Sequence, residues 1–337
     1  MTSNKKLFGQ FYTTNSDYIL QGLTVPDSTS MMIEPFAGNG DLVEWANKQT
    51  NNTVAIQCFD IDPKVLYATT CDTLLNPPNY KSRFVITNPP YLARNKNKNK
   101  DIYNKWAVDD LYKAFIKTIV QGEVEGGIII VPLNFLSDED SKTRDKFFQS
   151  YSITKLNIFE MKVFKDTDYT VCSFQFTRKK QTLPIPTTIF PSKKTMDISL
   201  EEKYGWRIGG EVYQTEPSKI KISRLLQHQI PNTTLFLNAV DTGTTAGRIR
   251  LSCNKPHFYG KNTDRAFATI VSSVPIKDEQ EVCDTFNSLL ENLRQKHHSL
   301  FLTNFRNSTK EYARKRISFD LAYTLIANIL MKNNTPT

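Results

Sequence analysis

Three short apolar segments in the first half of the chain each run directly into a polar or glycine-rich cluster. The segments are residues 31–33, 54–59 and 84–86, and the clusters begin at Glu34, Asp60 and Thr87. Apolar strands this short, separated by helical patterns, indicate a parallel sheet that is covered on both faces. Ligands of such sheets bind beyond the carboxyl ends of the strands. We therefore expect the three clusters to meet at one ligand site.

The remaining pattern predicts an α/β chain with a second, smaller domain. Further strands are expected at residues 128–131, 153–159 and 170–176, and helices at residues 42–46, 64–70, 109–121, 279–296 and 319–331. The sheet is predicted to be Rossmann-like, mostly parallel and flanked by helices on both faces. Residues 181–191 contain three prolines and are interpreted as a linker. The predicted domains are therefore residues 1–180 and residues 181–337.

The positive charge is concentrated in the second half of the chain. The 337 residues carry a formal net charge of +9, of which residues 1–180 contribute +2 and residues 181–337 contribute +7. A basic domain favours a polyanionic partner. Residues 94–100 alternate asparagine with lysine, and this loop is either solvated or in contact with phosphates.

Composition gives no indication of a metal site, a membrane segment or a secretion signal. The five cysteines are scattered without a C-x-x-C pair, which favours reduced thiols and no metal. No apolar run approaches about 18 residues, and the first residues lack the apolar segment of a signal peptide. We expect a cytoplasmic protein, and the richness in Asn, Lys, Ile and Thr points to a bacterial or viral host cell.

The cluster at residues 34–40 combines an acid with a glycine turn. Glu34 stands at a strand end, and Gly38 and Gly40 allow backbone N–H groups to approach a ligand closely. Asp60, at the tip of the next strand, can accept both hydroxyls of a ribose. The turn is not G-x-G-x-x-G, and no G-x-x-x-x-G-K-[ST] loop exists. A nucleoside without phosphates is therefore favoured over a dinucleotide or ATP.

The sharpest signal is the sequence Asn88-Pro89-Pro90-Tyr91. The two prolines stiffen the turn and remove two N–H donors, so the carbonyls of Asn88 and Pro89 are presented as fixed acceptors. Such a pair suits the amino group of an aromatic base: it would draw both hydrogens toward oxygen and aim the nitrogen lone pair at an electrophile. Tyr91 offers a ring on which the base can stack.

These motifs, in this order along residues 7–180, resemble the gamma-class DNA adenine-N6 methyltransferases, which carry S-adenosylmethionine on a Rossmann-like sheet. The matching segments are the N-terminal motif at residues 9–13, the glycine loop at 34–40, the ribose turn at 60–63, the acid motif at 71–73 and the catalytic motif at 88–91. Residues 110–115 and 126–135 match that family's next helix and strand in spacing. Residues 181–337 align with nothing, as expected of a variable recognition region.

The resemblance implies a role for individual residues. The catalytic residues would be Asn88, Pro89, Pro90 and Tyr91. Those that bind the cofactor would be Phe11, Thr13, Glu34, Pro35, Gly38, Gly40, Asp60, Ile61, Asp72, Thr73 and Asn88. Asp60 would hold the ribose, and Asp72 would read the amino group of the cofactor's adenine. Tyr91 and Phe164 would stack on the target base.

The function implied is site-specific methyl transfer from S-adenosylmethionine to N6 of an adenine turned out of double-stranded DNA, without a metal. The basic second domain would recognise the duplex, with DNA-binding candidates Arg248, Arg250, Lys255 and Lys261, and further candidates Arg314, Lys315 and Arg316. We expect a monomer on DNA, and the sequence does not state whether a cognate restriction endonuclease is functionally paired with it.

Three alternative interpretations of these motifs remain open. A cytosine-N4 methyltransferase usually has Ser in place of Asn88. RNA adenine and protein-glutamine methyltransferases also use Asn-Pro-Pro-Tyr, although a glutamine enzyme needs no long basic C-terminal half. A DNA-binding module with a vestigial cofactor fold would not bind S-adenosylmethionine.

Overall fold

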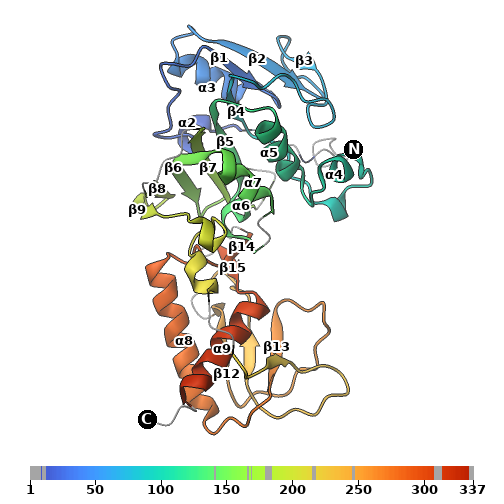
Figure 1. The fold of residues 1–337 in the computed structure, drawn as a ribbon, viewed down its shortest axis with the longest axis vertical. Coiled ribbons are helices and arrows are strands. Elements are labelled where there is room, and N and C mark those ends of the chain that lie inside the picture. Colours follow the sequence, from blue (N-terminus) through green and yellow to red (C-terminus); the bar gives the residue numbers. More distant parts are fainter. Residues whose placement is uncertain are drawn as a thin grey trace. The chain divides into compact units, whose positions relative to one another are not determined.

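The chain divides into two compact units, Met1–Trp206 (unit 1) and Arg207–Thr337 (unit 2), each of which is described by itself (Figure 1). The structure, a computed structural model, describes residues 9, 13–139, 142–164, 167, 169–178, 184–214, 218–244, 247–306 and 313–333.

Unit 1 is built on a nine-stranded sheet with the order β3-β2-β1-β4-β5-β7-β6-β8-β9. Its strands are β1 (Met31–Glu34), β2 (Ala55–Asp60), β3 (Thr69–Thr70), β4 (Phe84–Thr87), β5 (Gly126–Pro132), β6 (Ser152–Phe159), β7 (Val171–Thr177), β8 (Ile185–Phe190) and β9 (Lys194–Ile198). Strands β1 to β5 pair in parallel, β7 inserts antiparallel between β5 and β6, and β8 runs parallel to β6. The predicted mostly parallel sheet is confirmed.

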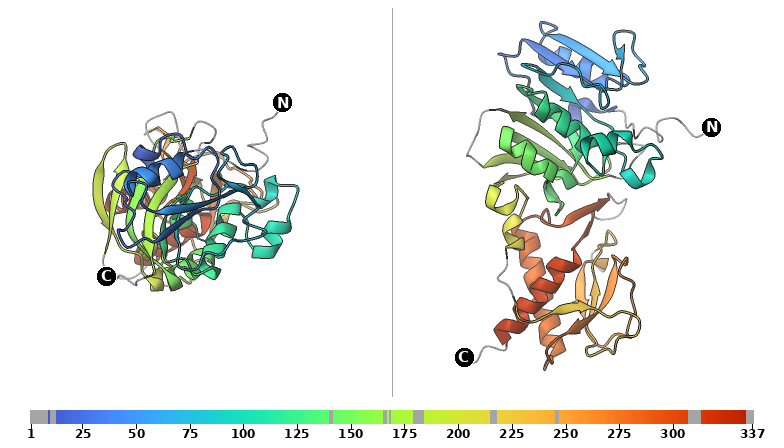
Figure 2. Two further views of the ribbon diagram at one scale, coloured as in Figure 1. Left: turned by 90° about the horizontal axis from the view of Figure 1, so that it is seen from above. Right: turned by 45° about the vertical axis from the view of Figure 1, so that its right-hand side comes forward.

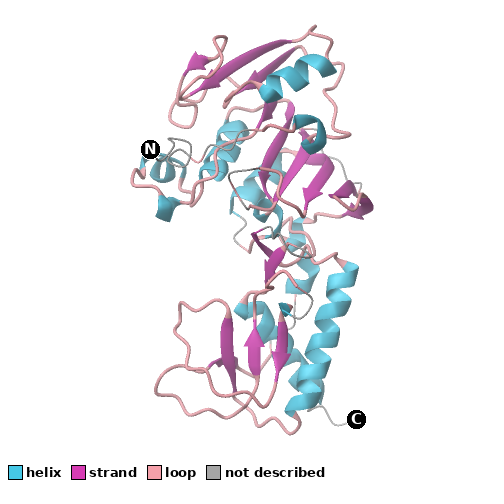
Figure 3. Cartoon of the chain, turned by 180° about the vertical axis from the view of Figure 1, so that it is seen from behind, coloured by secondary structure: helices cyan, strands magenta, loops and turns pink. Residues whose placement is uncertain are grey.

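Helices flank this sheet on both faces (Figures 2 and 3). They are α2 (Ser16–Ile19), α3 (Asp41–Gln49), α4 (Asp101–Trp106), α5 (Leu111–Gln121), α6 (Asn134–Ser137) and α7 (Lys142–Ser150), with 3-10 turns at Arg94–Lys96 and Glu202–Tyr204. Right-handed crossovers require this arrangement. The connection from β1 to β2 through α3 and the connection from β4 to β5 through α5 run in opposite directions from the centre of the sheet, so α3 and α5 lie on opposite faces. All seven residues of β5 are buried, which explains its continuous apolar run.

Two sequence predictions in unit 1 were wrong. Residues 64–70 form turns and strand β3 rather than a helix. Leu66 and Tyr67 there are exposed, so a helix would have had no buried face. The proline-rich residues after 184 form an antiparallel hairpin, β8 and β9, rather than a linker. Pro186 fits because it lies opposite Asp197, before the ladder with β6 begins at Thr187. The boundary between the two compact units lies after Trp206. The predicted division into domains at residue 180 stays a prediction.

Unit 2 combines a four-stranded antiparallel sheet with two helices. The sheet has the order β10-β13-β11-β12, with β10 (Ile222–Arg224), β11 (Phe236–Asn238), β12 (Arg250–Ser252) and β13 (Phe267–Ser272). The other elements are a 3-10 turn at Gly210–Tyr213, α8 (Glu279–Lys296), the pair β14 (Thr303–Arg306) and β15 (Arg314–Arg316), and α9 (Phe319–Asn333). The predicted helix at 279–296 is confirmed, and α9 begins at the predicted residue.

The helices α8 and α9 cover one face of the unit 2 sheet. Leu237, Leu251 and Ile270 point from three strands into a core shared with Phe286 of α8 and Ile326 of α9, and each of these side chains is at most 1% exposed. Successive strand residues point to opposite faces. The residues that alternate with this core therefore lie on the other face.

Among the described residues, no helix combines the length and apolar character that crossing a membrane requires.

Candidate active site

The polar residues predicted to form the site stand at neighbouring strand ends. Glu34 is the last residue of β1, Asp60 is the last residue of β2, and Asn88 follows β4 directly. Since β2, β1 and β4 are adjacent and parallel, these three ends lie at the same edge of the sheet (Figure 1). The predicted convergence of the three clusters is thus observed.

Glu34 is a buried carboxyl group with one oxygen in use and one without a partner. Its Oε1 accepts hydrogen bonds from the backbone N–H of Phe36, at 2.9 Å, and from the hydroxyl of Thr87. Its Oε2 is buried and finds no hydrogen-bond partner among the described residues. Burial, at 1% exposure, raises the pKa of Glu34 to about 8. A cation placed at Oε2 would reverse that shift.

Asp60 fastens the glycine loop to the end of β2. Its Oδ2 accepts the N–H of Gly38 at 2.8 Å, and its Oδ1 accepts the N–H of Asp62 at 2.8 Å. The N–H of Ala37 also donates to the carbonyl of Phe59, at 2.8 Å. The Asp60 side chain is 3% exposed. Each carboxylate oxygen keeps one lone pair for a further donor.

The glycine loop itself depends on backbone conformations that favour glycine. Gly38 has φ +50° and Gly40 has φ +87°, and Gly40 is the N-cap of α3. At Gly40 a Cβ atom would lie 2.2 Å from the Tyr67 hydroxyl. Any other residue would therefore clash with Tyr67, which is a second reason for glycine at this position.

The other predicted cofactor residues surround the same edge. Ile61, which follows Asp60, is 41% exposed and presents an apolar surface. Asp72 Oδ1 accepts the N–H groups of Leu74 and Leu75, both at 3.1 Å. Thr73 is buried and donates its hydroxyl to the carbonyl of Pro35 at 3.1 Å, which links the turn after β3 to the glycine loop.

The amide of Asn88 is held from both sides. Its Nδ2 donates to Thr13 Oγ1 at 3.1 Å, and its Oδ1 accepts from the Tyr91 hydroxyl. The Tyr91 hydroxyl oxygen also lies 2.8 Å from the carbonyl oxygen of Ile130, and its single proton is shared between this carbonyl and Asn88, so the loop is linked to β5. Asn88 itself is half-buried, and Pro89 is buried beside it.

The N-terminal motif packs against this loop. The Tyr91 N–H donates to the carbonyl of Gly9 at 3.0 Å. Gly9 has φ +68°, and a Cβ there would lie 2.7 Å from the Tyr91 carbonyl oxygen. Phe11, predicted to bind the cofactor, lies outside the described residues.

The two rings predicted to stack on a base are both buried. Tyr91 is 2% exposed and Phe164 is 3% exposed. Tyr91 makes edge contacts with the rings of Tyr112 and Tyr169, with centroids 6.3 Å away in each case. Base stacking by Tyr91 and Phe164 stays a prediction, and it requires the rings to become accessible.

Sequence reasoning missed two residues of the site. Thr87, the residue before the tetrapeptide, hydrogen-bonds Glu34 and is fully buried. Its place at a strand end was the available signal. Asp110 precedes α5, and its Oδ1 accepts the N–H of Leu92 at 3.1 Å, directly after Tyr91. Burial raises the pKa of Asp110 to about 7. Its place as the first residue of the matched segment 110–115 was the available signal.

The basic residues predicted to bind DNA lie in unit 2 and differ in their surroundings. Arg248 forms an ion pair with Glu291 of α8, with Nη1 and Oε2 2.8 Å apart. Arg250, Lys255 and Lys261 are exposed. Of the further candidates, Lys315 is 3% exposed and donates to the carbonyl of His298 at 3.4 Å. Burial thus excludes Lys315 from contact with DNA in this conformation.

Among the described residues, no group of three or more His, Cys, Asp or Glu side chains could hold a metal ion.

Comparison with known proteins gives one family match. Residues 40–164 match the family model described as Eco57I restriction-modification methylase, a stretch that contains Asp60 and the tetrapeptide 88–91. This stretch is therefore similar to methyltransferases of the restriction-modification type. No curated protein matches the chain.

Several solved structures are similar to part of the chain. A modification subunit of a putative type I restriction enzyme from Vibrio vulnificus aligns with a TM-score of 0.44 and 14% identity, over 55% of this chain and 49% of that one. A putative class I S-adenosylmethionine-dependent methyltransferase from Listeria monocytogenes aligns with a TM-score of 0.39 and 13% identity, over 51% and 61%. A type I restriction-modification methyltransferase subunit from Streptococcus thermophilus aligns with a TM-score of 0.38 and 15% identity, over 54% and 47%. The chain thus spans about half the length of the first of these proteins.

Proposed function

We propose that the protein is an S-adenosylmethionine-dependent DNA methyltransferase that modifies N6 of an adenine turned out of the duplex. The observation that carries the proposal is the sequence Asn88-Pro89-Pro90-Tyr91 at the carboxyl end of β4. It lies within the residues that match the restriction-modification methylase model. The asparagine at its first position favours adenine over cytosine as the target.

The residues at the sheet edge fit S-adenosylmethionine. The buried, unpartnered Oε2 of Glu34 suits an ammonium group such as that of the methionine moiety. Asp60 keeps lone pairs for ribose hydroxyls beside the exposed apolar surface of Ile61, on which an adenine can lie. Asp72 and Thr73 would border that adenine. When bound, S-adenosylmethionine supplies an electrophilic methyl group on a sulfonium.

The chain's own contribution to the reaction is positioning. Asn88 Oδ1 and the Pro89 carbonyl would accept the two hydrogens of the target amino group, which frees the nitrogen lone pair from conjugation with the ring. Thr13 and Tyr91 fix the Asn88 amide in one orientation before the base arrives. Positioning of this kind contributes roughly 7–11 kcal/mol toward lowering a barrier. No strong base is needed, because the nitrogen can lose its proton after alkylation.

The target adenine must leave the base stack to reach Asn88, which costs a few kcal/mol. Tyr91 and Phe164 would offset this cost by stacking on the base. Both are buried, so DNA binding would have to open the loop around them. Basic residues of unit 2 would hold double-stranded DNA, with the enzyme acting as a monomer beside a cognate restriction endonuclease.

The test is incubation of plasmid DNA with tritiated S-adenosylmethionine, followed by digestion to nucleosides. We expect label in N6-methyladenine. Label in N4-methylcytosine, or label only with RNA or protein substrates, would replace the proposal with the corresponding alternative. Asn88→Ala should abolish transfer while weakening cofactor binding much less than Asp60→Ala does, whereas Asn79→Ala, at a surface turn of the same unit, should change neither. Absence of cofactor binding by calorimetry would support a vestigial fold.

A further inference from the structure

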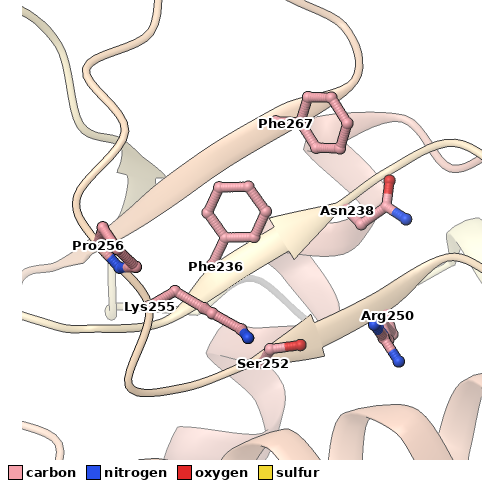
Figure 4. Close-up of a pocket in the computed structure, with 7 residues that line it drawn as sticks. All are labelled: Phe236, Asn238, Arg250, Ser252, Lys255, Pro256 and Phe267. Carbon is pink, nitrogen blue, oxygen red and sulfur yellow. The ribbon is translucent and has the colours of Figure 1, made fainter.

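The face of the unit 2 sheet that points away from α8 and α9 carries a shallow hollow of about 290 Å³. Seven residues line it: Phe236, Asn238, Arg250, Ser252, Lys255, Pro256 and Phe267 (Figure 4). We call this set the outer sheet face. Its strand residues alternate with the buried Leu237, Leu251 and Ala268, so the pleat of the sheet directs them outward.

Cross-strand pairing sets the spacing of the polar groups. Asn238 of β11 lies directly opposite Arg250 of β12, and Phe236 lies directly opposite Ser252. On the other side of β11, Asn238 lies opposite Phe267 of β13. An amide, a guanidinium and a ring therefore stand side by side on three neighbouring strands.

The two rings form an exposed aromatic platform. The centroids of Phe236 and Phe267 are 5.8 Å apart with an interplanar angle of 22°. Phe258 contacts Phe236 edge-on, at 6.5 Å and 86°, and supports the platform from the side. Phe267 is nevertheless 44% exposed. Exposed rings gathered on one sheet surface indicate a contact surface for a partner.

The charges on this face are all of one sign. Two of the seven lining residues, Arg250 and Lys255, are cations, and none is an acid. Neither cation forms an ion pair with any part of the chain that the structure describes, in contrast with Arg248, which is paired with Glu291. An anion is the natural partner for these two groups.

We propose that the outer sheet face is where unit 2 contacts the DNA substrate, with the Phe236–Phe267 platform against apolar base edges such as thymine methyl groups, phosphates on Arg250 and Lys255, and Asn238 on a base edge. This inference rests on the proposed function and adds residues that determine binding and sequence preference. Rings that contact thymine methyl groups, cations that bind phosphates and an amide that can pair with a base edge are groups by which proteins hold duplex DNA. A second copy of the chain is disfavoured, because each copy carries a net charge of +9.

The test measures binding of a fluorescein-labelled 30-base-pair duplex, cut from a plasmid region that the wild-type protein methylates, by anisotropy between 50 and 300 mM NaCl. For Arg250→Ala/Lys255→Ala we expect a loss on the order of 10-fold in affinity, and a salt slope reduced by about 1.8 because two phosphate contacts are gone. Lys277→Ala/Lys332→Ala removes two exposed cations outside the outer sheet face and should leave the slope nearly unchanged.

Variants of the ring residues test the contribution of the rings to DNA affinity separately from the contribution of the charges. Phe267→Ala should weaken binding on the order of 10-fold, because an apolar contact with the DNA is lost, with the salt slope intact, and Phe267→Tyr should restore affinity. Because the ring is exposed, both variants should melt within a few degrees of the wild type. Asn238→Ala should alter the order of preference among methylated sites.

The outcomes separate the inference from the proposed function. If the wild type methylates and binds the duplex but these variants bind equally well, the outer sheet face is not the contact surface and the proposed function stands. The same holds if Phe267→Ala instead dissociates a dimer and leaves DNA affinity unchanged. If the wild type neither binds nor methylates DNA, both proposals fall.

Discussion

The side-chain amide of Asn88 donates a hydrogen bond to the hydroxyl of Thr13 at 3.1 Å, although 75 residues separate the two in the chain. Thr13 is 4% exposed, and the nearby Gly9 carbonyl accepts the N–H of Tyr91. The N-terminal segment is therefore part of the framework that orients the proposed catalytic amide. Its resemblance to a cofactor-binding motif does not by itself reveal this second role.

Thr13→Val should lower kcat for methyl transfer by about 2- to 13-fold, the equivalent of one hydrogen bond of 0.5–1.5 kcal/mol. The reason is that Asn88 loses the acceptor that fixes its orientation. Single-turnover kinetics with saturating cofactor and DNA would measure the effect. Thr14→Val is the matched control, since Thr14 is exposed, and it should keep the wild-type rate. Equal rates for the two variants would remove Thr13 from the framework.

Tyr91→Phe should keep the ring and remove the hydroxyl, whose single proton is shared between Asn88 Oδ1 and the buried carbonyl of Ile130. We expect the free energy of unfolding to fall by about 1–3 kcal/mol, and kcat to fall with the KM for cofactor little changed. Tyr151→Phe is the control, because the Tyr151 hydroxyl makes a similar buried bond, at 3.1 Å, to the carbonyl of Ile119. That variant should lose stability without a loss in kcat, and a loss of activity in both would indicate a purely structural role for Tyr91.

Asp60→Ala should weaken S-adenosylmethionine binding, with little effect on affinity for DNA. It removes the acceptor for the Gly38 and Asp62 N–H groups, each bonded at 2.8 Å, as well as the proposed ribose ligand. Asp60→Asn keeps an acceptor for one of these N–H groups and should bind the cofactor more tightly than Asp60→Ala. Titration calorimetry gives the Kd of each variant. An unchanged Kd in Asp60→Ala would take Asp60 out of the cofactor site.

The strands of the sheet could be predicted from the sequence where their side chains are buried on both faces of the sheet. β5 is buried at every position, and its short continuous apolar run is typical of a strand covered on both faces. The segment at 64–70 is predicted to be a helix because Pro63 suits the first turn of one, yet Thr69 and Thr70 pair with the end of β2. Pairing with β2 therefore determines the strand conformation of Thr69 and Thr70. β8 was missed because prolines were taken to exclude a strand, whereas Pro186 lies where β8 pairs only with β9.

The location of the site could be predicted for those residues that stand at the ends of strands. Glu34, Asp60 and Asn88 follow apolar runs, so their convergence follows from the topology of a parallel sheet. Contacts that depend on side-chain direction left no trace in the sequence. Only the three-dimensional structure shows that Asn88 hydrogen-bonds both Thr13 and Tyr91. The same is true of the platform that Phe236 and Phe267 form from different strands.

The stability of the protein should fall between pH 5 and pH 8 because of Glu34. Burial raises the pKa of this carboxyl to about 8 in the folded protein, against 4.5 in the unfolded chain. Across this range the unfolded chain ionises while the folded protein retains its proton, so each rise in pH favours unfolding. The contribution is on the order of 4 kcal/mol over three pH units. The buried Asp110, with its pKa raised to about 7, acts in the same direction.

Glu34→Gln removes this titration and should flatten the dependence of unfolding free energy on pH, measured by urea denaturation at pH 5, 6, 7 and 8. The amide oxygen can still accept from Phe36 and Thr87, so the variant should be at least as stable as the wild type at pH 8. Glu44→Gln, at an exposed position on α3, should keep the wild-type slope. The same Glu34→Gln variant should bind S-adenosylmethionine more weakly, because a neutral amide at the Oε2 position cannot neutralise an ammonium group. A pH slope that persists in Glu34→Gln would mean that other groups, Asp110 first among them, govern the titration.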